Sequence, residues 1–217
     1  MKKRDEDDDK TADPFGVLRP KTKSANKYTT NIHEMAKAYE FLADGFEDIE
    51  ALAPVDILRR AGVEVKTVSI NATDTVESAH GVQVKADLVF GDADLGDADL
   101  LLIPGGMPGA RNLDMHEGVR AAVRKQAEAG RLVGAICAGP MVLGHLGLLQ
   151  GKRATCYPGF EGELDGAEYT AAPATIDGNI ITGKGPGATF NYAYLIVEVM
   201  KGSRVAEELK EQMMYDA

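Results

Sequence analysis

The fold is decided by the segment Leu132-Val133-Gly134-Ala135-Ile136-Cys137-Ala138-Gly139-Pro140. Its apolar run, residues 132–137, has the length of a buried parallel strand and ends on a cysteine. An apolar helical pattern follows up to Leu149, and Pro140 suits a first helical position. We therefore expect a strand that enters a helix through a very tight turn, with Cys137 at that turn.

Cys137 is the candidate nucleophile. The carboxyl end of a central strand is where open α/β sheets bind their ligands. The amino end of a helix carries free N–H groups and a dipole that favour a thiolate over a thiol. A buried structural cysteine is the alternative interpretation of the same pattern.

Composition bounds the class of protein. The 217 residues are 44% hydrophobic and 27% charged, which fits one large globular domain. The net charge of −10 argues against nucleic acid and anionic membranes as partners. No apolar run approaches the roughly 20 residues of a membrane span.

Cysteine and histidine usage indicates the compartment and the cofactors. Cys137 and Cys156 are too few for a disulfide framework, so a reducing cytoplasm is the expected location. The four histidines show no zinc-site spacing with them. We expect neither a metal ion nor another cofactor.

Residues 1–34 differ from the rest of the chain. They are polar, carry a basic and then an acidic run, and could bury little apolar surface to offset chain entropy. The acidic run ending at Lys10 resembles a protease-cleavage linker of the kind used in recombinant expression. We expect a disordered leader or upstream extension, with a basic–acidic docking arm as the alternative, and a single domain over residues 35–217.

The opening of that domain predicts a parallel sheet. A strand at 38–43, a helix at 46–60 and a strand at 63–70 form the βαβ unit of an α/β fold. A buried strand is expected at 100–103 and a hairpin around Asp177-Gly178. The other expected elements are short strands at 75–77, 82–85 and 153–156, hairpin strands at 173–177 and 179–182, and helices at 117–129, 188–200 and 203–214, the last capped by Ser203.

Glu50 is the second candidate catalytic residue. It begins the apolar stripe of the first helix, in register with Pro54, Ile57 and Leu58. A buried carboxyl group has a raised pKa, so it could donate a hydrogen bond to a thiolate or act as a general acid or base. The alternative is an acidic residue favoured at a helix amino end by the dipole, and periodicity alone leaves both open.

A second loop could bind an anion. The strand at 100–103 opens into Pro104-Gly105-Gly106, whose bare N–H groups could cradle an oxyanion. A simple strand-to-helix turn is the alternative. The glycine-rich stretch 183–187 lacks the spacing of a phosphate loop.

Together these pieces resemble the ThiJ/PfpI superfamily, and more closely its branch of the parkinsonism-associated protein deglycase and bacterial homologues. The resemblance covers the chain from about Met35 onward. It rests on the segments at 43–50 (ADGFEDIE), 54–62 (PVDILRRAG), 103–106 (IPGG), 135–140 (AICAGP) and 185–187 (GPG), in the family's order and spacing. It implies a flavodoxin-like three-layer sandwich with a mostly parallel sheet, a cysteine nucleophile elbow and a homodimer.

The resemblance also assigns roles to individual residues. Cys137 matches the elbow nucleophile, which is also the site of oxidation to sulfinate, and Glu50 matches the glutamate that hydrogen-bonds its sulfur. Gly105, Gly106 and Ala138 match the backbone oxyanion donors, whereas Arg60, Gly185 and Pro186 match the dimer-side wall of the pocket.

Three positions depart from the family pattern. Tyr157 stands where many members carry a histidine near the nucleophile, and Ala138 stands where the protease-like branch has a histidine. His80 stands where close relatives often carry an arginine that lines an anion pocket. No Cys–His pair is evident in the sequence, which disfavours a protease.

Three functions remain. The first is glutathione-independent detoxification of reactive aldehydes such as methylglyoxal, of glyoxalase III or protein deglycase type, by Cys137 and Glu50. The second is a non-enzymatic redox sensor or stress chaperone in which Cys137 is oxidised to sulfinate. A glutamine-amidotransferase-like hydrolase ranks last, because it needs a downstream histidine and none follows His145.

Overall fold

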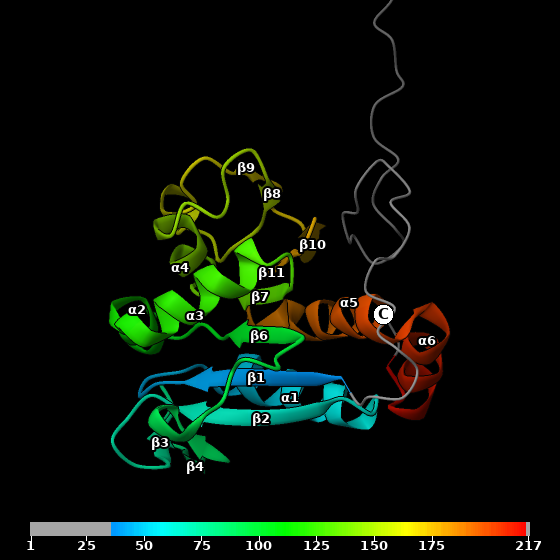
Figure 1. The fold of residues 1–217 in the computed structure, drawn as a ribbon. Helices are drawn as coiled ribbons and strands as arrows, with labels where there is room; N and C mark the ends of the chain where they lie inside the picture. The colour runs from blue at the N-terminus through cyan, green and yellow to red at the C-terminus, as the bar shows by residue number, and fades with distance from the viewer. Residues whose placement is uncertain (1–35, 216–217) are drawn as a thin grey trace, which may run out of the picture.

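The computed structural model describes residues 36–215 and centres on one seven-stranded sheet (Figure 1). From edge to edge its strands are β10 (Ala174–Asp177), β11 (Ile180–Gly183), β7 (Leu132–Ile136), β6 (Leu100–Ile103), β1 (Lys37–Leu42), β2 (Glu64–Ser69) and β5 (Leu88–Val89). Every neighbouring pair is parallel except β10 with β11. The predicted α/β fold with a mostly parallel sheet is confirmed. The predicted leader at 1–34 lies outside the described residues.

Helices cover both faces of the sheet and make the three layers. Helices α1 (Asp48–Arg60), α5 (Thr189–Lys201) and α6 (Ser203–Gln212) share one core cluster with alternate strand residues such as Leu100 and Leu102. Helices α2 (Gly109–Met115), α3 (Glu117–Glu128) and α4 (Pro140–His145) share the other cluster with Leu101 and Ile103. The continuous apolar run of β6 is therefore explained by burial on both faces.

Smaller elements extend from this core. Strands β3 (Thr75–Glu77) and β4 (Gln83–Lys85) form an antiparallel hairpin, which confirms the short strands predicted at 75–77 and 82–85. Strands β8 (Arg153–Ala154) and β9 (Glu168–Tyr169) form a second two-stranded sheet. Short 3-10 turns lie at η1 (Phe90–Asp92), η2 (Glu161–Glu163) and η3 (Pro186–Ala188). No helix within residues 36–215 is long and apolar enough to cross a bilayer.

Some element boundaries differ from the predictions. The first helix begins at Asp48 because the side chain of Glu47 caps it, accepting a hydrogen bond from the Glu50 amide. The helix after Cys137 ends at His145, two residues before Gly147 adopts a positive φ of 72°. Ser203 is not a cap, because its hydroxyl donates to Glu198 instead.

The sequence patterns did not predict two of the strands and one of the α-helices. Strands β5 and β9 have only two residues each, which is too short for a period-2 pattern to register. Helix α2 has seven residues and lacks a side-chain cap, so no start signal marks it.

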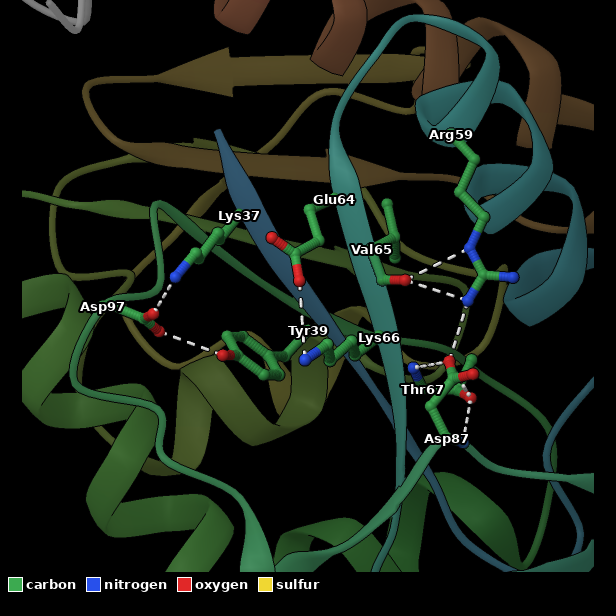
Figure 2. A network of polar contacts seen from close by, with 9 residues as sticks. All are labelled: Lys37, Tyr39, Arg59, Glu64, Val65, Lys66, Thr67, Asp87 and Asp97. Atoms are coloured by element: carbon green, nitrogen blue, oxygen red, sulfur yellow. Dashed lines mark hydrogen bonds and ion pairs between the residues drawn. The ribbon is translucent and has the colours of Figure 1, made fainter. Parts of the chain in front are cut away.

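A polar network fastens the carboxyl end of α1 to the edge of the sheet (Figure 2). One carboxylate oxygen of Asp87 accepts hydrogen bonds from the Thr67 amide at 2.8 Å, the Thr67 hydroxyl at 2.9 Å and the Arg59 guanidinium at 2.7 Å. Arg59 also donates two hydrogen bonds to the carbonyl of Val65. These bonds fix the helix whose other end carries Glu50.

On the neighbouring strand β1, Tyr39 donates to Asp97 at 2.9 Å, and Asp97 also pairs with Lys37 (Figure 2). Burial and the Asp97 carboxylate raise the pKa of Tyr39 to about 12, so the phenol stays a donor at neutral pH. Glu64 pairs with Lys66 at 3.4 Å. The start of β1 is therefore tied to the loop before β6.

Replacing Asp87 tests this network. Asp87→Ala leaves the amide and hydroxyl of the buried Thr67 without their acceptor, so we expect a loss of about 1–3 kcal/mol in the free energy of unfolding. Urea unfolding followed by circular dichroism measures it. Asp92→Ala, at an exposed aspartate in the 3-10 turn η1, is the control and should change stability by less than about 0.5 kcal/mol. Equal effects of the two changes would contradict the assigned role.

Candidate active site

Cys137 lies in the turn between β7 and α4, with a φ of 63°. Its amide donates to the carbonyl of Gly183 at 2.9 Å, and its carbonyl accepts from the amide of Tyr157 at 3.0 Å. A side chain at Gly139 would place a Cβ 2.6 Å from the carbonyl oxygen of Ile103, so the turn accepts only glycine there. The left-handed residue and the close approach are the geometry of a sharp strand-to-helix turn that presents a nucleophile.

Glu50 projects from the first turn of α1 and is 0% exposed, which decides between the two alternatives that periodicity left open. Its Oε2 accepts a hydrogen bond from the amide of Gly105 at 3.1 Å. Burial raises the pKa of this carboxyl from 4.5 to about 7. The charge of Glu47 adds to the rise, whereas hydrogen bonds with the Cys137 thiol and the Gly105 amide oppose it. Glu50 thus changes its protonation near neutral pH.

The thiol and the carboxyl act as a pair. Burial, the Glu50 charge and the hydrogen bond to Glu50 all raise the pKa of Cys137, whereas hydrogen bonds from the amides of Ala138 and Gly106 lower it. The expectation that the helix amino end alone favours the thiolate is wrong, because burial beside a carboxylate outweighs it. A thiolate is favoured only when Glu50 holds the proton.

The two glycines after β6 serve different purposes. A Cβ at Gly105 would collide with Glu50 Oε2 and lie 2.6 Å from the Cβ of Cys137. The Gly105 amide already binds Glu50, which corrects its assignment as an oxyanion donor. The amides of Gly106 and Ala138 face the sulfur instead. The site therefore has two backbone N–H donors, those of Gly106 and Ala138, beside the thiol.

Tyr157, Gly185 and Pro186 lie beside this pair. A Cβ at Gly185 would lie 3.0 Å from the ring of Tyr157 and 3.9 Å from Glu50 Oε1, and Pro186 begins the 3-10 turn that follows. Tyr157 is 46% exposed, although Cys137 is 9% exposed. The structure thus brings the predicted tyrosine and the glycine–proline turn to the outer side of the site.

Arg60 and His80 are not brought to the thiol. Arg60 lies in the last turn of α1, ten residues and about 15 Å of helix rise beyond Glu50, and pairs with Asp56 at 2.9 Å. The Nδ1 of His80 lies 2.6 Å from Asp48, which raises the pKa of the imidazole. Neither side chain hydrogen-bonds to Cys137 or Glu50, so their predicted places in the pocket wall find no support within this chain.

No histidine within residues 36–215 pairs with Cys137. His116 caps α3 by accepting from the Val119 amide, and His145 lies 2.8 Å from both Asp114 and Glu163. With His80 bound to Asp48, the Cys–His pair missing from the sequence is missing from these residues as well.

Among residues 36–215, one group of side chains could hold a metal ion. Ligand atoms of Glu47, Asp48 and His80 lie within 4.8 Å of one another. Each already has a protein partner, since Glu47 caps α1 and Asp48 binds both Ser78 and His80. Sequence spacing missed the group because His80 comes from the β3–β4 hairpin.

Cys156 is fully buried and free. Burial raises the pKa of its thiol to about 12, with a smaller contribution from Glu161, so it stays protonated. The sequence reasoning missed two other buried polar residues, Glu40 and Tyr192. A glutamate within an otherwise apolar strand was the available signal for the first.

The family of the chain follows from comparison with known proteins. The sequence pattern of the DJ-1/PfpI family matches residues 36–199. The chain belongs to the DJ-1/PfpI family. Cys137 and Glu50 both lie inside the matched region.

Curated relatives and solved structures agree with this membership. The Parkinson disease protein 7 homolog of Danio rerio is 35% identical over 182 residues, which cover 82% of this chain and 96% of the relative. A deglycase of Pyrococcus horikoshii is 32% identical over 161 residues, 73% of this chain and 96% of its own. The chain spans only 45% and 39% of the DJ-1 homologs A and B of Arabidopsis thaliana, at 36% and 38% identity.

Two solved structures have the same fold. Toxoplasma gondii DJ-1, in a form described as oxidized, superposes with a TM-score of 0.81 at 33% identity and covers 84% of this chain and all of its own. A DJ-1 superfamily protein of Salmonella typhimurium, solved as a cysteine-to-alanine mutant, has a TM-score of 0.81 at 33% identity over the same shares.

The pKa of Glu50 has a consequence for stability in this DJ-1/PfpI family member. The folded state binds the Glu50 proton more tightly than the unfolded chain, so stability falls as pH rises from about 4.5 to about 7, by up to about 3 kcal/mol. Glu50→Gln should therefore gain stability relative to wild type across that window. Urea unfolding at pH 5 and pH 8 measures the difference.

The matched control is Glu211→Gln, at an exposed carboxylate on the surface. It should leave the pH dependence of wild-type stability in place. A Glu50→Gln curve that runs parallel to the wild-type curve would show that Glu50 does not titrate between those limits.

Proposed function

We propose that this protein detoxifies reactive aldehydes by a cysteine-dependent reaction of glyoxalase III or protein deglycase type, as part of a carbonyl and oxidative stress response. One observation carries the proposal. The thiol of Cys137 hydrogen-bonds to a fully buried carboxyl whose pKa is about 7, and two amides donate to the same sulfur. The similarity to archaeal proteins named deglycases supports an enzymatic role.

The reaction uses each of these groups in turn. Glu50 takes the thiol proton, and the thiolate of Cys137 attacks the aldehyde carbon of methylglyoxal to give a hemithioacetal. Glu50 returns the thiol proton to the oxygen of this adduct and can then remove the hydrogen of the same carbon as a proton, which gives an enediolate. The hydroxyl proton passes to the neighbouring oxygen and Glu50 protonates the neighbouring carbon, which leaves a lactoyl thioester. Water hydrolyses the thioester to lactate and restores the thiol.

The backbone supplies the electrostatic stabilisation. The amides of Gly106 and Ala138 already point at the sulfur, so an oxyanion formed on the adjacent carbon meets both donors. A Glu50 carboxyl that titrates near pH 7 can both give and accept a proton at neutrality. This is why the reaction needs no histidine.

Tyr157 occupies the outer side of the site, beside Gly185. Its phenol is a poor base at neutral pH but can donate a hydrogen bond to a substrate oxygen. We assign it a binding role. The proposal also includes a reducing cytoplasm as the location and a homodimer as the assembled form, since the family resemblance implies a pocket wall from the second copy.

The direct test measures methylglyoxal loss and lactate formation without glutathione. Cys137→Ala should abolish lactate formation, and Glu50→Gln should lower it at least about 100-fold, the usual share of a general acid or base. Cys156→Ser is the matched control and should stay close to wild type. Lactate formation that survives Cys137→Ala would refute the proposal.

A second candidate function is redox sensing through the same cysteine. The absence of a histidine partner for Cys137 within residues 36–215 favours it. Two molecules of peroxide would convert the thiolate to sulfenate and then sulfinate, and the amides of Gly106 and Ala138 would stabilise the negative sulfur oxyacid.

Peptide mass spectrometry after mild peroxide treatment tests this second function. We expect Cys137 to gain two oxygens at least ten times faster than Cys156, because Cys156 lacks a hydrogen-bonding partner that stabilises the charged form. Glu50→Gln removes the charge that raises the pKa of the Cys137 thiol, so it should speed the oxidation of Cys137. Equal oxidation of the two cysteines in folded protein would exclude the sensor.

A further inference from the structure

Glu40 is a carboxylic acid in the middle of a central parallel strand. It is 1% exposed, and its neighbours in the sheet are Thr67 of β2 and Leu102 of β6. Directly opposed residues of a parallel sheet share a face, and Leu102 belongs to the cluster under α1 and α5. Glu40 therefore points to the same side of the sheet as the helix that carries Glu50.

The row of residues across the sheet continues to Tyr192. Leu102 is in register with Gly134 of β7, and a Cβ at Gly134 would collide with the hydroxyl of Tyr192. The missing side chain thus makes room for a phenol from α5 against the sheet. Glu40 and the Tyr192 hydroxyl lie along one row on one face.

Two buried polar atoms in this region have no hydrogen-bond partner among the described residues. The Tyr192 hydroxyl and Glu50 Oε1 are both buried and unpaired. Buried polar groups without partners are rare in folded proteins and call for an explanation.

Electrostatic interactions also couple Glu40, Glu50 and Tyr192. Burial raises the pKa of Glu40 well above its ordinary value, and the charge of Glu50 raises it further. Burial raises the pKa of Tyr192, as do the charges of Glu40 and Glu50. Burial therefore favours the forms of Glu40 and Tyr192 that carry an O–H group, whereas Glu50, with a pKa of about 7, is the member that ionises near neutral pH.

We propose that Glu40 and Tyr192 are positioning residues that form a buried cluster with Glu50, in which their O–H groups stabilise the negative charge that Glu50 and Cys137 share. Glu50 Oε1 is the acceptor this arrangement leaves free, while Oε2 stays bound to Gly105. Hydrogen bonds to an ionised group are about twice as strong as neutral ones. Glu40 acts on the thiol only through Glu50.

The groups that face Glu40 limit other causes of a pH effect. From α1 the ionisable neighbour is Glu50, and from α5 it is Tyr192. The facing residues of the strands, Thr67, Leu102 and Gly134, do not ionise. The next acid beyond them is Asp87, which binds the Thr67 hydroxyl.

The inference rests on one part of the proposed function, namely that Cys137 and Glu50 share a proton. Alkylation of the thiol reports that proton without any aldehyde. A protein that shows the effect below but converts no methylglyoxal would overturn the proposed reaction and leave this cluster in place.

The experiment measures the alkylation rate of Cys137 by iodoacetamide from pH 5 to pH 9 in the full chain, with the labelled peptide quantified by mass spectrometry. Removing a donor should make the shared charge harder to form. Glu40→Leu should therefore raise the midpoint of the rate profile by about one pH unit, a tenfold lower rate below the midpoint. Tyr192→Phe should shift it in the same direction, and Glu40→Gln, which keeps an N–H donor and the volume, should shift it less.

The control repeats Glu40→Leu in the Glu50→Gln background. A positioning role acts through the carboxyl, so the shift should vanish there, whereas a general loosening of the core would persist. A Glu40→Leu profile that superimposes on wild type, or a shift that survives Glu50→Gln, overturns the proposal. If Glu40→Leu does not fold, Tyr192→Phe decides alone, because it removes one oxygen and keeps the ring.

Discussion

The burial of one carboxyl group governs this structure. Glu50 is fully enclosed where the amino end of α1, the loop after β6 and the turn after β7 meet. Enclosing a carboxyl is costly unless hydrogen bonds replace its water, and here an amide from the β6 loop does so. The same enclosure forbids a side chain at Gly105, which touches both Glu50 and Cys137. The three segments are therefore fixed relative to one another by the needs of a single polar group.

The chemistry of the site follows from the same enclosure. Both the thiol and the carboxyl lose water, so each holds its proton more tightly than it would in solution. Hydrogen bonds with the Cys137 thiol and the Gly105 amide offset this for Glu50, whereas the amides of Gly106 and Ala138 offset it for Cys137. A cysteine at a helix amino end is thus insufficient to make a thiolate in this chain. In the reaction that we propose, the pair is the functional unit, and one proton moves between its members.

Local patterns predicted the architecture well. The apolar runs of β6 and β7 and the tight turn at Cys137 follow from period and from residue type in sequence, whereas the period of the first helix left the burial of Glu50 open. Contacts between distant segments were out of reach of such patterns. The bond from the Gly105 amide to Glu50 depends on how the β6 loop meets α1. His80 was expected in the pocket, but the β3–β4 hairpin carries it to Asp48. The row that joins Glu40 to Gly134 depends on sheet register, which one sequence does not reveal.

The lack of a side chain at Gly134 also constrains which substitutions this chain can accept. Because the Tyr192 hydroxyl fills the space that a Cβ would need, neither residue can change freely while the other stays. An alanine at 134 requires the phenol oxygen to leave first, and losing that oxygen at 192 opens a hole that favours a larger residue at 134. The two positions lie 58 residues apart in the printed sequence, yet substitutions there should be inherited as a pair. Close packing against the sheet thus predicts correlated substitutions at positions 134 and 192.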